Sequence, residues 1–263
     1  MGSHVTVIEE SGQIASREDQ DVAEPLQDLL RMEGIDFQLS SKVTRVEFLN
    51  SRLTLTIEGT EGPFELEVSH VFVATGCQAN TDDLGLETIG VEVSDAGIVA
   101  VNERLATNVK GIWAVGDIRG GPMFTHTSWD DYRVLMSQLT GDGSHTTDRI
   151  VPYAIFSDPE LGRVRMTERE AHKTDKDIKV ARYEMKKNGK AREQRDTLGF
   201  VKLIVETDTK QILGAAVLAV EGAELIHMYV DLMNAGVPYT VIKDAVHIHP
   251  TMAEALQSVM LKI

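Results

Sequence analysis

The sequence predicts an α/β fold in its first part, followed by an α+β domain with an antiparallel sheet. In the first part, short apolar or β-branched runs alternate with helical periodicity, which is typical of strands joined by crossing helices. In the last part, three apolar runs take up much of residues 178–220 and indicate antiparallel strands. Residues 141–148, rich in Gly, Ser, Thr and Asp, are predicted to link the two parts.

The composition argues against several classes of function. The chain has 263 residues, enough for two domains or parts of three, and a net charge of −15. Nucleic acids and anionic membranes bind clustered Lys and Arg, so neither is an expected partner. No apolar run approaches the ~20 residues of a transmembrane helix, and no signal peptide is expected before Val5. The single cysteine, Cys77, cannot form an intramolecular disulfide, which favours a cytoplasmic, reducing compartment.

The first predicted strand, residues 5–9, ends in Glu9 and precedes an amphipathic helix over residues 21–32. Pro25 is compatible only with the first turn of that helix. In dinucleotide-binding folds an acid at the end of the second strand bonds the ribose of NAD. Residues 5–9 are expected to correspond to that second strand, so Glu9 is a candidate for this role. A surface glutamate is the alternative. No Gly-x-Gly-x-x-Gly loop precedes this strand, so dinucleotide binding is expected to be weak or absent.

Five more strands are predicted before the middle of the chain, of which the second to fourth form a β-meander and the last is buried. They cover residues 36–39, 42–49, 53–58, 64–68 and 71–74. Turn-forming residues separate most of them.

A Thr-led turn at Thr107 leads to another predicted strand over residues 112–115, which ends in Gly116 and Asp117. Gly116 lets a backbone approach closely, because it has no Cβ. Asp117 at the carboxyl edge of a sheet could accept hydrogen bonds from ligand hydroxyls. An ordinary turn is the alternative. Thr125 is the predicted N-cap of a helix that runs to about residue 139.

The last part of the sequence predicts strands over residues 153–156, 162–166, 178–185, 199–206 and 211–220. The T-x-x-E pattern of Thr167 to Glu170 predicts a capping box that opens a helix. A further helix is expected over residues 223–235 and ends at Gly236.

The segment from His247 to Glu254 reads His-x-His-Pro-Thr-x-x-Glu. A neutral imidazole can accept a proton near pH 7, and a carboxylate beside it stabilises the imidazolium, so an acid/base pair is one interpretation. Two others remain open. Thr251 and Glu254 fit a capping box, and His247 and His249 on an extended segment have the spacing of a metal-binding pair.

These motifs together resemble the class I pyridine nucleotide–disulfide oxidoreductases, which include dihydrolipoamide dehydrogenase, glutathione reductase and mercuric reductase. The resemblance rests on Val-Phe-Val-Ala-Thr-Gly at residues 71–76, on residues 107–117 and 120–126, and on the His–Glu segment. It implies an FAD site in which Asp117 bonds the ribityl chain and the helix start faces the isoalloxazine ring. The residues that it places at the flavin are Ala74, Thr75, Gly76, Gly116, Asp117, Met123, Phe124, Thr125 and His126.

The resemblance also implies that His249 is the acid/base and that Glu254 orients it. In the family this histidine reaches across a dimer interface to the redox cysteines of the other subunit. Residues 149–263 would then form the interface domain of a homodimer. The chain departs from the family at Cys77-Gln78-Ala79-Asn80, where Gly-Arg-x-Pro-Asn commonly occurs, which weakens the expectation for the domain crossover.

The resemblance divides the chain into a partial NAD-binding domain (1–75), the C-terminal part of an FAD-binding domain (76–148) and the interface domain (149–263). The expected function is the C-terminal portion of an FAD-dependent NAD(P)H:disulfide or metal-ion oxidoreductase, with half of the flavin site and an incomplete NAD site. Residues 1–263 alone are expected to be inactive. The alternatives are a dimerisation module without cofactor, and a chain that pairs with a separate polypeptide.

Overall fold

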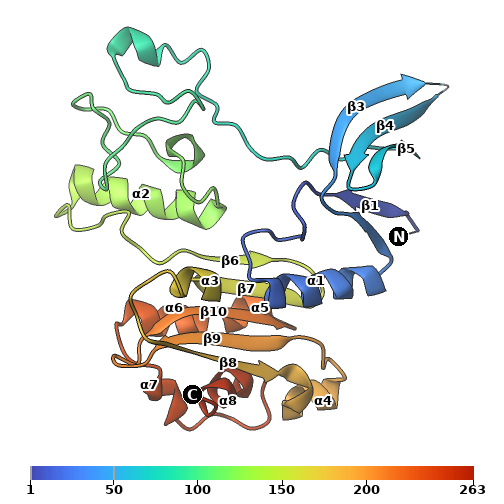
Figure 1. Cartoon of the computed structure of the whole chain (residues 1–263). Helices are drawn as coiled ribbons and strands as arrows, with labels where there is room; N and C mark the ends of the chain where they lie inside the picture. The colour runs from blue at the N-terminus through green and yellow to red at the C-terminus, as the bar shows by residue number, and fades with distance from the viewer. Residues whose placement is uncertain (1, 50) are drawn as a thin grey trace. The chain divides into compact units, whose positions relative to one another are not determined.

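The computed structural model describes residues 2–49 and 51–263 (Figure 1). The chain forms two compact units, Met1–Phe72 with Pro152–Ile263 and Val73–Val151. Among the described residues, every named strand lies in the first unit. The two units are therefore described in turn.

A small parallel pair of strands opens the first unit. β1 (Val5–Ile8) pairs in parallel with β2 (Ile35–Gln38), and α1 (Gln20–Met32) joins them. Parallel strands need such a crossover. The predicted strand and helix are confirmed, but the expectation for Pro25 was wrong, because Pro25 is the sixth residue of α1 and lies beyond its first turn. The Asp21 carbonyl, which lacks an N–H donor from Pro25, instead accepts a hydrogen bond from Arg182 Nη1 at 2.8 Å.

The predicted β-meander is confirmed: β3 (Lys42–Leu49), β4 (Arg52–Gly59) and β5 (Gly62–Val68) pair antiparallel in that order. The buried strand predicted over residues 71–74 was wrong. Phe72 is 92% exposed, and no strand of the described residues pairs with this segment. An apolar run becomes a buried strand only when neighbouring strands take up its backbone hydrogen bonds, and β1 and β2 form a sheet of their own.

The five strands predicted after the linker form one antiparallel sheet in the order β6-β7-β10-β9-β8. Their bounds are β6 Pro152–Ile155, β7 Glu160–Arg165, β8 Ile178–Glu184, β9 Phe200–Glu206 and β10 Ile212–Ala219. The pairing of these five strands confirms the predicted antiparallel sheet. Gly199, with a φ of +94°, lies so close to the Leu218 carbonyl that a Cβ would not fit between them.

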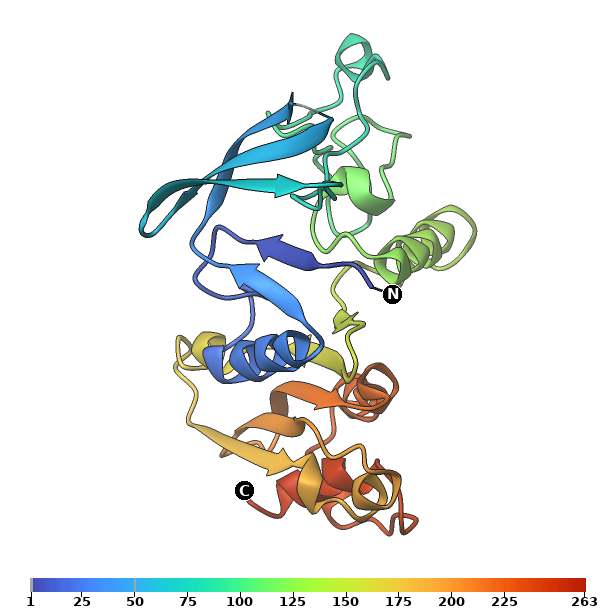
Figure 2. The ribbon, with the colours of Figure 1, turned by 90° about the vertical axis from the view of Figure 1, so that its right-hand side faces the viewer.

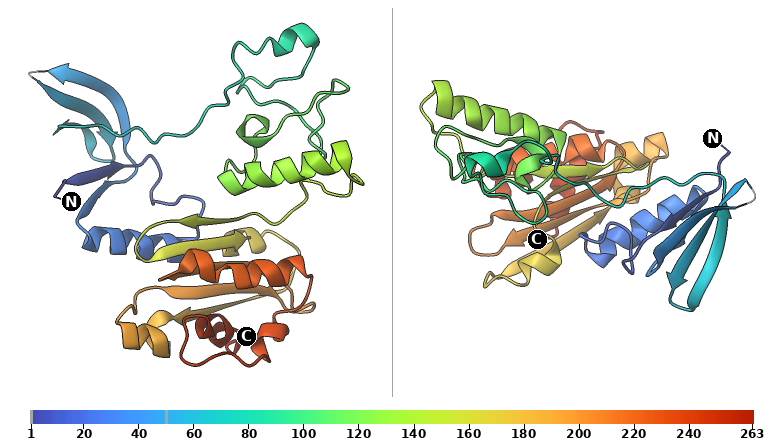
Figure 3. Two further views of the ribbon diagram at one scale, coloured as in Figure 1. Left: turned by 180° about the vertical axis from the view of Figure 1, so that it is seen from behind. Right: turned by 90° about the horizontal axis from the view of Figure 1, so that it is seen from above.

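Short helices surround this sheet, and the C-terminal ones lie in front of it in the left view of Figure 3. Their bounds are α3 Glu168–Ala171, η3 Met185–Lys187, α4 Gly189–Gln194, α5 Gly222–Leu225, α6 His227–Asn234, α7 Thr240–Lys243 and α8 Glu254–Met260. The capping box of Thr167 and Glu170 on α3 is confirmed in both directions. The single helix predicted over 223–235 was wrong, because this segment forms two helices, α5 and α6, that are separated at Ile226. The Ile226 carbonyl accepts hydrogen bonds from the N–H groups of both Tyr229 and Val230. In the described part of the chain, no helix has the length and apolar character that a membrane crossing requires.

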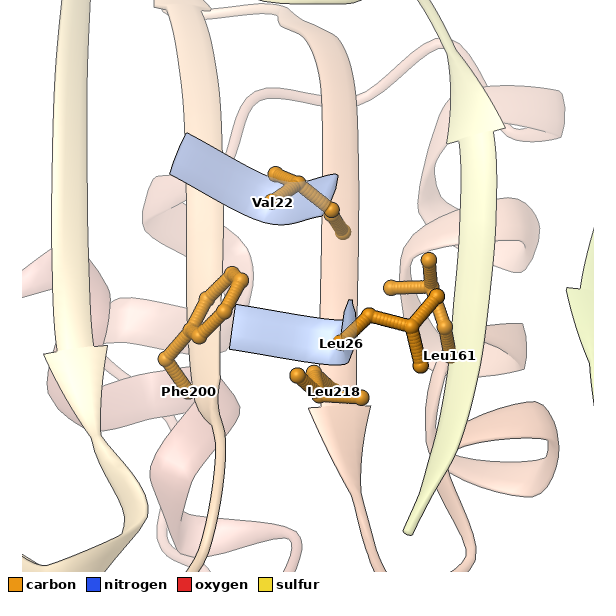
Figure 4. Close-up of a cluster of buried hydrophobic side chains, with 6 residues drawn as sticks. Val22, Leu26, Leu161, Phe200 and Leu218 are labelled. Atoms are coloured by element: carbon orange, nitrogen blue, oxygen red, sulfur yellow. The ribbon is translucent and has the colours of Figure 1, made fainter. Parts of the chain in front are cut away.

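Helix α1 lies against the other face of the five-stranded sheet (Figure 2). Figure 4 shows Val22 and Leu26 of α1 pointing toward Leu161, Phe200 and Leu218, and all five side chains are buried. The contact covers a large apolar surface of three strands. Helix α1 is thus part of the core of the sheet, although it connects β1 to β2 along the chain.

Charged groups at the start of α1 reinforce this contact. The Asp19 carboxylate accepts hydrogen bonds from the Glu168 and Arg169 N–H groups, at 2.8 and 3.0 Å, and so caps α3. Lys202 Nζ on β9, whose side chain is 1% exposed, lies 3.2, 2.6 and 2.7 Å from carboxylate oxygens of Asp19, Asp21 and Glu168. These three acids are spaced as metal ligands could be, but the Lys202 ammonium lies within hydrogen-bonding distance of all three.

Residues 73–151 form the second unit, with a small core of Val91, Val99 and Ala114. η1 (Leu86–Ile89) and η2 (Gly116–Arg119) contribute side chains that pack against this core, and α2 (Thr125–Thr140) contacts η2. The predicted turn at Thr107 is confirmed, since its hydroxyl donates to the Ile112 carbonyl at 3.0 Å. The predicted strand over 112–115 was wrong. Only Trp113 forms a bridge, to Ala106, and no further strand extends the pairing among the described residues.

Candidate functional site

The Gly116–Asp117 turn opens η2 and packs against α2. Gly116 has a φ of +74°, and a Cβ there would come 3.3 Å from Ser128 Oγ of α2. A left-handed conformation with so little space requires glycine. The neighbouring Asp117 is exposed, and its Oδ1 lies 3.4 Å from the Ser128 hydroxyl. The turn therefore presents a carboxylate that can accept hydrogen bonds from a ligand.

The start of α2 lies next to this turn in the sequence and contacts it. The N-cap is Phe124 and not the predicted Thr125, which is the first helical residue, and the Phe124 side chain makes no capping hydrogen bond. The Phe124 and His126 rings stack with centroids 5.1 Å apart. No acidic side chain lies in the first turn, so the partial positive charge of the helix end is not neutralised from within α2.

The other residues predicted at the same site are not brought to this turn. Ala74, Thr75 and Gly76 are exposed and lie outside any helix or strand. Within the described residues, no hydrogen bond joins them to Gly116 or Asp117. Met123 is half-buried just before α2. The turn and the start of α2 thus form the organised part of the predicted site.

The second candidate site is the pair of His249 and Glu254. His249 Nδ1 lies 2.9 Å from Glu254 Oε1, and the histidine side chain is 74% exposed. Glu254 Oε2 accepts the Thr251 N–H at 2.8 Å. This N–H bond, and then the nearby His249, hold the pKa of Glu254 below its usual range. Glu254 is therefore a carboxylate at neutral pH that fixes the histidine ring through Nδ1 and leaves Nε2 for proton exchange.

The two competing interpretations of this segment are only partly fulfilled. The capping box is half formed, because Glu254 accepts the Thr251 N–H but the Thr251 hydroxyl donates to the Ile248 carbonyl at 2.9 Å. For the metal alternative, His247 and His249 belong to no group of three ligating side chains in the described residues. The hydrogen-bonded His–Glu pair is the arrangement that the structure forms.

Glu9 follows β1, and one of its carboxylate oxygens accepts the Ser11 N–H at 2.8 Å. It lines a cleft together with Ser16, Arg17 and Tyr153. The carboxylate thus stabilises its own turn. The position agrees with the predicted strand end, and the ribose role stays a prediction.

Comparison with known proteins places these features in one family. A profile described as "Pyridine nucleotide-disulphide oxidoreductase" matches residues 1–131. A second, described as "Pyridine nucleotide-disulphide oxidoreductase, dimerisation domain", matches residues 151–260. The chain belongs to the pyridine nucleotide–disulfide oxidoreductase family. The resemblance inferred from the motifs is therefore confirmed.

Relatives from bacteria and plants support this assignment. The probable pyridine nucleotide-disulfide oxidoreductase RclA of Escherichia coli is 37% identical over 257 residues, which are 97% of this chain and 57% of the relative. The mitochondrial dihydrolipoyl dehydrogenase of Pisum sativum is 32% identical over 98% of this chain and 52% of its own length. The chain thus spans about half the length of the curated relatives that it matches.

Solved structures agree with the fold. The HOCl-induced flavoprotein disulfide reductase RclA from Escherichia coli superimposes with a TM-score of 0.92 at 35% identity, over all of this chain and 60% of that one. LpdA from Mycobacterium tuberculosis gives a TM-score of 0.90 at 21% identity, over 99% of this chain and 56% of that one, and shows the fold alone. The predicted combination of mixed α/β regions with an antiparallel sheet is confirmed.

The residues present fit part of the FAD site that members of this family have. A glycine in a left-handed turn gives room for close approach, an exposed carboxylate follows it, and a helix end without an acidic first turn lies beside it. Hydroxyls suit the carboxylate, and an electron-rich ring edge suits the helix end. One residue of this arrangement, Asp131, was missed from the sequence, where a charged residue inside a helix indicates only a solvated face.

Proposed function

We propose that residues 1–263 form the C-terminal portion of an FAD-dependent NAD(P)H:disulfide or metal-ion oxidoreductase. In this proposal the chain contributes half of the flavin site, a dimer interface and an acid/base pair. The observation that carries it is the 2.9 Å contact of His249 with Glu254, in a region that matches the family's dimerisation domain. RclA of Escherichia coli has been solved as a Cu(II) complex, so a relative binds a metal ion, which is why the proposal keeps a metal ion beside disulfides.

The chemistry assigned to His249 is proton transfer. A bound flavin would supply the redox chemistry by relaying an electron pair from the nicotinamide to a disulfide. His249 would take the proton of a cysteine thiol at Nε2, while Glu254 holds the ring through Nδ1 and stabilises the imidazolium. Glu254 can do so because the Thr251 N–H keeps it ionised. Glu254 can thus accept the Thr251 N–H and stabilise the His249 imidazolium at the same time.

A homodimer through residues 149–263 is part of the proposal. Val246 is fully exposed and Ile248 is 80% exposed, on the same segment as His249. Large apolar side chains gathered beside a polar site are typical of protein–protein interfaces. A second copy would cover these two side chains. In the family arrangement His249 then faces redox cysteines of the other subunit, which residues 1–263 do not contain. The alternative form of this proposal is that residues 1–263 pair with a separate polypeptide, which supplies the redox cysteines.

Residues 1–263 by themselves are expected to show no NADH-dependent disulfide reduction. The sequence contains one cysteine, and Cys77 has no second thiol with which to form a redox-active disulfide. It also contains no Gly-x-Gly-x-x-Gly loop for the pyrophosphate of a dinucleotide. NADH oxidation followed at 340 nm, with a disulfide substrate and added FAD, checks this. Turnover that survives Cys77→Ser and scales with enzyme concentration would contradict the proposal.

Asp117→Asn is expected to weaken FAD binding about tenfold to a hundredfold. Loss of the charge weakens hydrogen bonds from the ribityl hydroxyls, and bonds to charged groups are worth about 1.5–3 kcal/mol. Quenching of flavin fluorescence during titration of residues 1–263 measures the affinity. Asp95→Asn, an exposed carboxylate of the same unit, is the matched control and should bind FAD like the wild type. Equal affinities for both variants would assign no role to Asp117, and a chain that binds no FAD would favour a dimerisation module.

A further inference from the structure

Asp131 of α2 is a buried carboxylate with four hydrogen bonds. Its side chain is fully buried, and Oδ2 accepts from the Gly116 N–H at 2.9 Å and from Arg119 Nε at 2.5 Å. Its Oδ1 accepts from Arg119 Nη2 at 2.8 Å and from Arg149 Nη2 at 2.5 Å. Both oxygens are thus satisfied, and one side chain joins η2, α2 and the end of the unit.

The partners of Asp131 enclose Asp117 along the chain. Gly116 is the first residue of η2 and Arg119 is its last, so Asp131 holds both ends of a four-residue turn. Gly116 has a left-handed conformation, and its N–H donates to the Asp131 carboxylate. Asp117 lies between these two fixed points and faces solvent.

The hydrogen bonds around Asp131 favour its ionised form. Burial alone would raise the pKa of Asp131, but the bonds from Arg119, the Gly116 N–H and Arg149 outweigh it and lower the pKa. The neighbouring Asp130 shares Arg149, whose Nη1 lies 2.5 Å from Asp130 Oδ2. Of these two adjacent acids, Asp131 accepts the hydrogen bond from the Gly116 N–H, whereas Asp130 bonds Arg133 and Arg149.

We propose that Asp131 is a positioning residue, which orients the Gly116–Asp117 turn so that the Asp117 carboxylate meets the hydroxyls of the flavin. This inference rests on the proposed function, because the bonds of Asp131 to Gly116 and Arg119 matter to a ligand only if Asp117 binds the flavin. The anchor acts through Asp117 and does not touch the ligand. Preorganised groups of this kind require neighbours that lock them in place, and buried charge-assisted bonds are suited to that task.

Asp131→Asn and Asp130→Asn in residues 1–263 form the matched pair for the test. Asp131→Asn is expected to speed amide hydrogen exchange of residues 116–119 at least tenfold, while protection along α2 persists. It should also weaken FAD binding at least tenfold and change the visible circular dichroism of the bound flavin. Asp130→Asn, which keeps the Gly116 contact, should leave all three unchanged.

Two results would overturn the inference. Exchange that quickens uniformly across residues 73–151 would make Asp131 a general stabilising residue. Faster exchange confined to residues 116–119, with unchanged flavin affinity and dichroism, would mean that the turn's orientation does not matter to the ligand. Asp117→Asn in the same titration separates the two hypotheses. If affinity depends on Asp117 but not on Asp131, only the inference fails; if wild-type chain binds no FAD, the proposed function fails and the inference falls with it.

Discussion

Residues 149–263 alone are expected to remain unfolded or to aggregate, although they contain the entire five-stranded sheet. One face of that sheet is covered by α1, whose Val22 and Leu26 pack on Leu161, Phe200 and Leu218. Deleting α1 exposes this apolar face to water, and each large side chain that becomes exposed costs about 1.5–3 kcal/mol. The net stability of a domain is only about 5–15 kcal/mol, so a loss of this size exceeds what a short chain can tolerate.

Buried charges make the deletion more costly. Lys202 would lose Asp19 and Asp21, and Arg163 on β7, which is 1% exposed, would lose Glu18. A buried ion without its partner destabilises the fold strongly. Circular dichroism and thermal unfolding of residues 149–263 check the prediction, with a chain that joins residues 13–33 to residue 149 through a flexible linker as the control. Cooperative unfolding of the shorter chain at the temperature of residues 1–263 would contradict it.

Single substitutions in α1 test the same contact without a deletion. Leu26→Ala is expected to lower the free energy of unfolding by about 2–5 kcal/mol, the range for a fully buried leucine. Met32→Ala lies on the same helix but is 75% exposed, and it should change little. Urea unfolding of both variants gives the comparison.

Lys202→Met is expected to lower the free energy of unfolding by about 3 kcal/mol at pH 7. The substitution removes the ammonium from among three carboxylates while it keeps most of the apolar stem. Removing one partner of a buried pair costs about 3–5 kcal/mol, and the lower end applies because Asp21 and Glu168 are partly exposed. Lys176→Met is the control, since its bond to Glu206 at 2.6 Å lies at a surface where the lysine is 40% exposed. That variant should lose at most about 1 kcal/mol.

The effect of Lys202→Met should depend on pH. Burial tends to raise the pKa of Asp19, but the Arg169 and Glu168 N–H groups and Lys202 lower it overall. A carboxyl whose folded-state pKa is depressed stabilises the protein above its unfolded-state pKa, and this contribution is lost as pH falls through the folded-state value. Protonation also relieves the repulsion among the acids of the variant. The difference from wild type should therefore be fully present at neutral pH and shrink as pH falls below about 4. A difference that is constant with pH would contradict this explanation.

The sequence could predict most of the elements but not the contacts that hold them together. The strands of the meander and of the large sheet follow from local alternation of side chains. Residues 71–74 and 112–115 have equally apolar sequences, yet they are not strands, because pairing depends on neighbours that no local pattern reveals. The same limit hid the packing of α1, since nothing near Leu26 indicates a partner at Phe200.

The candidate site divides along the same line. His249 and Glu254 are five residues apart in a motif, so their contact could be predicted, and the structure places them in hydrogen-bonding distance. Asp131 could not be recognised, because its partners Gly116, Arg119 and Arg149 meet it only in the folded chain. The short-range contact of His249 with Glu254 could be predicted from the sequence, whereas the buried bonds of Asp131 could not.

A hybrid enzyme tests the central claim most directly. In it, residues 1–263 replace the matching part of Escherichia coli RclA, so that the relative supplies the remaining length. The measurement is the rate of NADH-dependent disulfide reduction by the flavin-loaded hybrid and by its His249→Ala variant. We predict turnover that His249→Ala reduces about a hundredfold to ten-thousandfold, the range for a general acid/base, with an intermediate loss for Glu254→Gln. A flavin-loaded hybrid whose rate is unchanged by His249→Ala would contradict the assignment of the acid/base pair, and a hybrid that folds without retaining flavin would contradict the half-site.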